Sequence, residues 1–202
     1  MITGLVLGFT INSAKNTLET NNRNIRALAT ELILLDRTMR ALGPEAEATR
    51  QHLVEYVQNW LIQEDTTHHW LLEENTQQEA LLDTIGTGLK DIRASDEQKV
   101  ELWDDALHLY RQVTRQRWVL IDASGGTIPT PLIIMLILWL AIIFASFGYR
   151  APRNTIVTAS FFLAALLISA TLYLIVDMDT PTTGVIEVSK VPVQRALAQL
   201  QR

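Results

Sequence analysis

Two long uncharged apolar runs constrain this chain more than any other feature. They cover residues 131–147 and 155–176. A transmembrane helix needs about 20 mostly apolar residues to cross roughly 30 Å of hydrocarbon, with about 17 as the lower limit. Both runs meet that limit, so we expect two transmembrane helices. Because only residues 148–154 join them, the two spans form an antiparallel pair, and the segments before and after the pair lie on the same side of the membrane.

A third apolar segment, at residues 1–12, is too short to span a bilayer alone, because a helix rises only about 1.5 Å per residue. It lacks the basic flank and the cleavage pattern of a signal peptide. We expect a partial transmembrane helix, with part of the span upstream of this sequence. Gly4 and Gly8 form a pair that lets two membrane helices approach closely, although two glycines in a short apolar stretch also occur by chance.

The region between these apolar segments, residues 13–124, is charged and helical in pattern. It contains 12 Lys and Arg residues against 19 Asp and Glu residues. Asn21 interrupts a repeat of apolar residues at every seventh position, and Gly43 with Pro44 ends it, which predicts one long helix. Further helices are expected after Pro44, near Thr76 and near Ser95, where capping patterns occur. The repeat consists of Ile11, Leu18, Ile25, Leu32 and Met39, interleaved with Ala14, Leu28, Leu35 and Leu42.

The expected architecture is therefore an all-α integral membrane protein. A long helical hairpin or bundle forms the soluble domain, beside the antiparallel pair of spans and the partial N-terminal membrane helix. Residues 177–202 form a C-terminal tail, in which 184–193 read as a short strand or extended arm and 196–200 as a small helix. Basic residues favour the cytoplasmic side of a membrane. They predict a multi-pass protein of the cell inner membrane with a cytoplasmic soluble domain: five of them (Arg111, Arg115, Arg117, Lys190 and Arg195) flank the pair on the soluble-domain side, against Arg150 and Arg153 in its loop.

The sequence offers no recognisable catalytic chemistry. It contains no cysteine, and no phosphate-binding loop, nucleophile motif or acid–base pair appears in a known frame. His68 and His69 lie among acidic residues, but adjacent side chains on a helix point about 100° apart. We therefore expect no enzyme activity, cofactor, metal site or nucleic-acid partner. The candidates at the membrane surface are Arg150, Arg153, Asp177 and Asp179, although the two aspartates also suit helix termination.

Several motifs together resemble the bacterial bestrophin-like domain family. The resemblance implies a membrane protein with four spans and a helical cytosolic domain between the second and third, as in bestrophin chloride channels. This chain would then begin midway through the second span. The motifs lie at residues 4–10, 34–37, 42–46, 147–148, 151–154, 174–181 and 184–186.

Two functions follow as hypotheses. The first is an oligomeric ion channel or pore, with the lipid membrane, further copies of the chain and ions as partners. Its N-terminal helix would line or pack around a central path. The alternative is a non-conducting scaffold or sensor that acts through the heptad helix of the soluble domain. The pore or helix-packing candidates are Thr3, Gly4, Gly8, Thr10 and Asn12.

Overall fold

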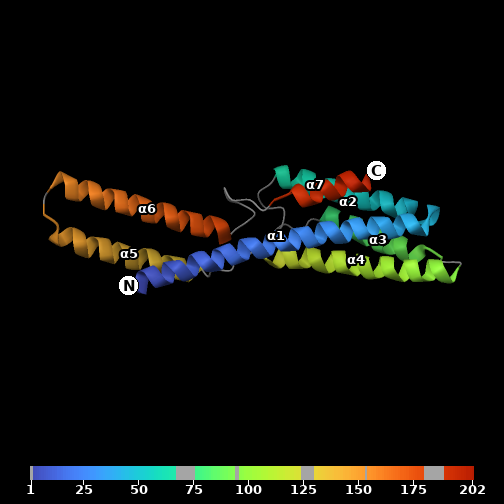
Figure 1. Ribbon diagram of the computed structural model, residues 1–202, viewed down its shortest axis with the longest axis horizontal. Coiled ribbons are helices and arrows are strands. Elements are labelled where there is room, and N and C mark those ends of the chain that lie inside the picture. The colour runs from blue at the N-terminus through green and yellow to red at the C-terminus, as the bar shows by residue number, and fades with distance from the viewer. Residues whose placement is uncertain (1, 67–75, 94–95, 124–129, 153, 180–188) are drawn as a thin grey trace. The chain divides into compact units, whose positions relative to one another are not determined.

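The computed structural model describes residues 2–66, 76–93, 96–123, 130–152, 154–179 and 189–202 (Figure 1). All regular elements in these ranges are helices, which confirms the predicted all-α class. They divide into two compact units. The first, called here the membrane unit, contains Met1–Leu18 and Gly126–Ile186; the second, the helical unit, contains Glu19–Gly125 and Glu187–Arg202. The helix α1 (Ile2–Leu42) begins in the first unit and continues into the second.

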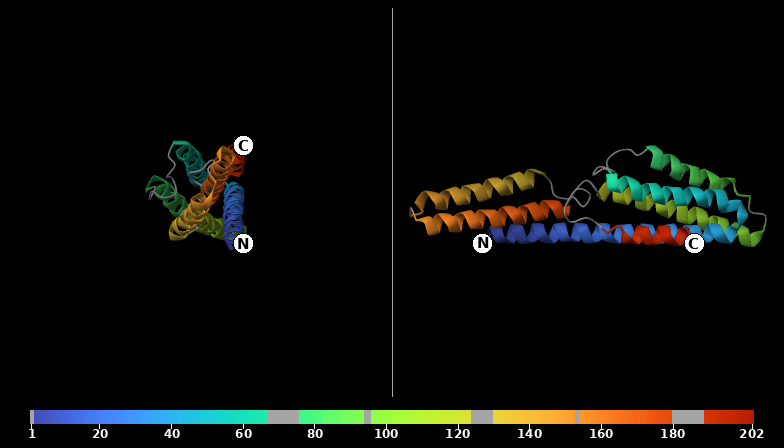
Figure 2. Two further views of the ribbon diagram at one scale, coloured as in Figure 1. Left: turned by 90° about the vertical axis from the view of Figure 1, so that its left-hand side faces the viewer. Right: turned by 90° about the horizontal axis from the view of Figure 1, so that it is seen from above.

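The membrane unit contains the two predicted spans as α5 (Thr130–Arg150) and α6 (Thr155–Asp179). They run antiparallel and side by side (Figures 1 and 2). Their most apolar parts have mean hydropathies of 2.5 and 2.3, and only 6% of each is buried. Because these helices are apolar outside as well as inside, they are not the core of a water-soluble fold, and both are long enough to cross a bilayer.

Local interactions explain how α5 and α6 are joined. The side-chain oxygen of Asn154 accepts a hydrogen bond from the backbone amide of Ile156 at 3.1 Å, which caps the first turn of α6. Between the helices, the rings of Phe144 and Phe161 meet edge to face with their centroids 6.4 Å apart. That geometry is favourable for aromatic pairs. Arg153 lies outside the described residues.

The helical unit packs four longer helices and one short helix around a common apolar core (Figure 1). The heptad repeat of α1 supplies one wall, and its members from Ile25 to Leu42 are at most 4% exposed, as predicted. At the start of the repeat, in the membrane unit, Ile11 is 42% exposed whereas Ala14 is buried. After α1, the unit comprises the 3-10 turn Pro44–Ala46, α2 (Glu47–Thr66), α3 (Thr76–Asp91), α4 (Glu97–Ala123) and α7 (Val191–Leu200).

The helix boundaries lie close to the start and stop signals predicted from the sequence. Gly43 ends α1 with φ 93° and ψ −157°, a conformation that is almost exclusive to glycine. The next helices begin at Glu47, Thr76 and Glu97, within two residues of the predicted starts. Ser95, which was expected to cap the last of them, lies outside the described residues.

The C-terminal tail differs from its prediction. The terminal helix begins at Val191 rather than at residue 196, so the expected strand or arm is wrong for residues 191–193. Pro192 lies in the first turn, where its fixed φ favours a helix start. Val193, Ala196 and Leu200 share one face at helical spacing and are at most 1% exposed, so burial selects the helix. Residues 184–188 lie outside the described ranges.

Candidate functional site

The N-terminal part of α1 presents an open face. Gly4, Gly8 and Asn12 recur every four residues, which places them on the same side of the helix. A Cβ atom added at either glycine would meet nothing within 4 Å. Asn12 is exposed, and its amide has no hydrogen bond to any described residue. The structure therefore brings together three of the five pore or helix-packing candidates.

Thr10 lies off this face. Its hydroxyl donates a hydrogen bond to the carbonyl oxygen of Val6 at 2.7 Å, so the donor is satisfied inside the helix. The side chain of Thr3 is outside the described part of the chain. Leu5 and Phe9, which follow the two glycines, are 76% and 75% exposed. At the start of α1, both the glycine positions and the large apolar side chains are therefore exposed.

The membrane-surface candidates do not form one site. Arg150 is exposed at the last residue of α5, close to the start of α6. Asp177 is 6% exposed near the other end of α6, roughly 33 Å further along that helix at about 1.5 Å per residue. Asp179 is the last residue of α6, with its side chain outside the described set. The two aspartates therefore lie at the opposite end of the span from Arg150.

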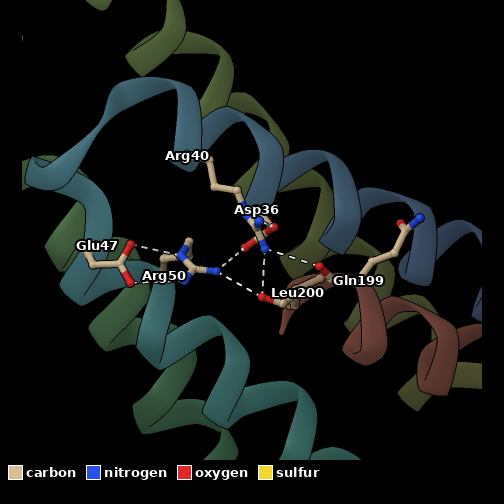
Figure 3. A network of polar contacts seen from close by, with 6 residues as sticks. All are labelled: Asp36, Arg40, Glu47, Arg50, Gln199 and Leu200. Atoms are coloured by element: carbon tan, nitrogen blue, oxygen red, sulfur yellow. Dashed lines mark hydrogen bonds and ion pairs between the residues drawn. The ribbon is translucent and has the colours of Figure 1, made fainter. Parts of the chain in front are cut away.

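A group of polar residues in the helical unit escaped the sequence reasoning. This group, called here the polar clamp, joins three helices (Figure 3). Nε of Arg40 lies 2.8 Å from the carboxylate of Asp36, and Nη2 donates to the carbonyl oxygens of Gln199 and Leu200 at 3.2 and 2.8 Å. Nη1 of Arg50 donates to Asp36 at 3.3 Å and to the Leu200 carbonyl at 3.0 Å. The members are Asp36 and Arg40 of α1, Glu47 and Arg50 of α2, and the carbonyl groups of Gln199 and Leu200.

The clamp completes the C-terminal end of α7. The last carbonyl groups of a helix have no intrahelical donor, and here two guanidinium groups supply one. Asp36 is only 3% exposed, and the two arginines compensate its buried charge. Arg50 also bonds both oxygens of Glu47 at 3.0 and 3.1 Å, which lowers the pKa of Glu47 and raises that of Arg50. The clamp thus holds α7 against α1 and α2.

Part of this group was visible in the sequence. Asp36 follows Leu35 on the buried side of α1, where an acid requires a partner, and Arg40 is four residues away on the same face. Arg50 and the α7 carbonyl groups come from other parts of the chain, and no local pattern indicates them. Elsewhere in the described residues, no group of three or more acidic or histidine side chains is placed to hold a metal ion. His68 and His69 are outside those residues.

Comparison with known families decides the classification. A family profile, described as the Bestrophin-like domain, matches residues 1–193. The chain belongs to the bestrophin-like family. This confirms the resemblance inferred from the motifs, and together with the exposed apolar helices it makes the chain a membrane protein. No curated protein and no solved structure matches the chain. The open face of α1 and the α1 and α2 parts of the clamp fall within the region matched to the bestrophin-like domain.

Proposed function

We propose that this bestrophin-like protein is an oligomeric ion channel or pore of the cell inner membrane, with its helical unit on the cytoplasmic side. The observation that supports the proposal most is the open face of Gly4, Gly8 and Asn12 on α1. Small residues at this spacing let two membrane helices approach closely. Further copies of the chain would supply the neighbours that α1 lacks.

Asn12 gives this face its second property. A buried amide without a partner in an apolar environment costs several kcal/mol, so Asn12 is best accommodated against a polar group of another copy or against water. The two full spans offer no comparable group, because residues 131–147 and 155–176 contain no Asn or Gln and no Asp, Glu, Lys, Arg or His. A conducting path is therefore better supported along α1 than through the pair of α5 and α6. The charged side chains of α5 and α6 lie only at the ends of these helices.

The charge distribution supports the proposed orientation. Five basic residues flank the α5–α6 pair on the side of the helical unit, against Arg150 and Arg153 in the loop. Basic residues near span ends stay on the cytoplasmic side. The segment 45–105 has 15 acidic against four basic residues, whereas the parts nearer the spans are richer in arginine. The sign of the conducted ion follows from whichever charge lies closer to the path, and reversal potentials in salt gradients measure it.

Planar-bilayer recording of the purified full-length protein tests the proposal. We expect discrete currents above background, and we expect Gly8→Leu to reduce them strongly because its side chain obstructs the open face. Phe9→Leu is the matched control, since it changes a residue of similar depth on another face of α1. The absence of current under varied ions and voltages, in protein shown to be folded and inserted, would contradict the channel.

The alternative of a scaffold or sensor loses its original support. It rested on the heptad repeat of α1 as a surface for partners, but the repeat from Ile25 to Leu42 is buried within the chain's own helical unit. Native mass spectrometry still separates the possibilities, because a strict monomer without a partner would exclude both the oligomeric channel and the scaffold.

A further inference from the structure

A pocket of about 250 Å³ lies between α1 and the end of α7, next to the polar clamp. Drug-sized ligands occupy pockets of roughly 300–1,000 Å³, and one water accounts for about 30 Å³. The space therefore suits a small ion with a few waters better than a large organic molecule. The pocket is lined by Ile33, Asp36, Arg37, Arg40, Gln199 and Arg202.

Arg40 is held in place beside this pocket. Its Nε is fixed by Asp36 and its Nη2 by the carbonyl groups of Gln199 and Leu200 (Figure 3). Nη1 has no hydrogen-bond partner among the described residues, and 38% of the side chain is exposed. A guanidinium that is already ordered loses little conformational entropy when it binds a ligand. Arg40 is therefore a preorganised hydrogen-bond donor whose Nη1 is available to a ligand.

The pocket also carries excess positive charge. Arg37 and Arg202 are exposed, and neither side chain has a hydrogen bond or ion pair with any described residue. The acid in the lining is Asp36, which is nearly buried and is already compensated by Arg40 and Arg50. Arg40 and Arg50 balance the charges of Asp36 and Glu47, so the guanidinium groups of Arg37 and Arg202 supply the excess positive charge of the pocket. Planar guanidinium groups match the oxygens of phosphate-type anions and bind them more strongly than they bind neutral acceptors.

From this arrangement we propose that the pocket binds a small phosphate-type oxyanion, through Arg37, Arg40 and Arg202. Inorganic phosphate or the phosphoryl group of a small soluble metabolite carries this chemistry, and so does a lipid headgroup. The residues that line the pocket all belong to the helical unit, and none of them is part of the two apolar helices that could cross a membrane. We therefore take the soluble source as the proposed one.

Isothermal titration of the full chain with inorganic phosphate tests the site. The protein is placed in nanodiscs of zwitterionic lipid, and sodium chloride at matched ionic strength serves as the reference titrant. We expect saturable binding of phosphate, weakened about five- to tenfold by Arg37→Gln and less by Arg37→Lys, which keeps the charge but loses the planar fork. Arg93→Gln, a change at another exposed arginine, should leave the affinity within about twofold of the parent.

The outcomes separate the possibilities. An unchanged thermal midpoint for Arg37→Gln without phosphate shows that the variant is folded, as the exposure of Arg37 leads us to expect. No saturable binding, or equal binding by the parent and Arg37→Gln, would overturn the proposal. A second titration uses nanodiscs that contain phosphatidic acid. If that lipid alone blocks modification of Arg37 by phenylglyoxal, while free phosphate does not, the soluble source is wrong.

Discussion

The carboxylate of Asp36 lies 2.8 Å from Nε of Arg40 and 3.3 Å from Nη1 of Arg50, so a single nearly buried acid joins α1 to α2. The same two guanidinium groups hold the carbonyl oxygen of Leu200. Two consecutive helices, α1 and α2, and the much later α7 thus depend on one carboxylate. The stability of the helical unit and the attachment of α7 are therefore linked.

Replacing Asp36 with asparagine should destabilise the helical unit. The change keeps the shape of the side chain but leaves Arg40 without its counter-charge and Arg50 with Glu47 alone. Loss of one partner from a fully buried ion pair costs about 3–5 kcal/mol; we expect about 2 kcal/mol because the arginine side chains retain 21% and 38% exposure. Circular dichroism during heating in detergent should show a midpoint lower by about 4–8 °C. Asp104→Asn, at an exposed position of α4, should change it by less than about 2 °C, and an equal loss there would contradict this account.

A second prediction concerns the close approach of α2 and α3 at Gly88. A Cβ atom at this position would lie 2.5 Å from Oγ1 and 3.2 Å from Cγ2 of the buried Thr49. Gly88→Ala should therefore destabilise the unit by about 1–3 kcal/mol, although alanine is the better helix former. Chemical denaturation measures the loss.

The double variant Gly88→Ala with Thr49→Ala provides the matched test. Removing the threonine side chain opens space for the new methyl group, so the double variant should be more stable than the sum of the two single changes predicts. Additive effects would show that the contact between these residues is not the cause.

Glu31 should make the stability of the helical unit depend on pH. One of its carboxylate oxygens is buried without a hydrogen-bond partner, and burial raises its pKa above the ordinary value of 4.5, while the charge of Arg115 opposes the shift. The folded state then holds the proton more tightly than the unfolded state, so this residue's contribution to stability falls as pH rises from 4.5 through the folded pKa.

Glu31→Gln removes that titration. At pH 7 the variant should unfold at a higher temperature than the parent, and the difference should disappear as the pH falls below 4.5, where both states of the parent become protonated. A stabilisation that persists unchanged at low pH would contradict the role of the buried charge. Glu55→Gln, at an exposed position, serves as the control.

The fold could be predicted largely because its signals are local. Hydrophobic length identified α5 and α6, a seven-residue period identified the buried face of α1, and Gly43 with Pro44 marked its end. The start of α7 could not be placed in the same way. Val191 and Val193 fit a strand as well as a helix in isolation, and only the core provided by α1 and α2 makes the helix the better choice.

The candidate sites were only partly accessible to sequence reasoning. Helical spacing alone places Gly4, Gly8 and Asn12 on one face. The hydrogen bond from the Thr10 hydroxyl to the Val6 carbonyl oxygen depends instead on the rotamer of Thr10. The polar clamp requires that Arg40 and Arg50 meet the end of a helix about 150 residues later in the chain. Such a contact depends on tertiary packing and leaves little trace in the spacing of residues.

The central claim, that the Gly4, Gly8 and Asn12 face of α1 borders an ion path in an oligomer, is tested most directly by cysteine modification during bilayer recording. These 202 residues contain no cysteine, so Asn12→Cys and Phe9→Cys each introduce one thiol into this part of the protein. We predict that a charged methanethiosulfonate reagent changes the current of Asn12→Cys within seconds and leaves that of Phe9→Cys unaltered. Equal responses of the two variants, or no current from the unmodified full-length protein, would contradict the claim.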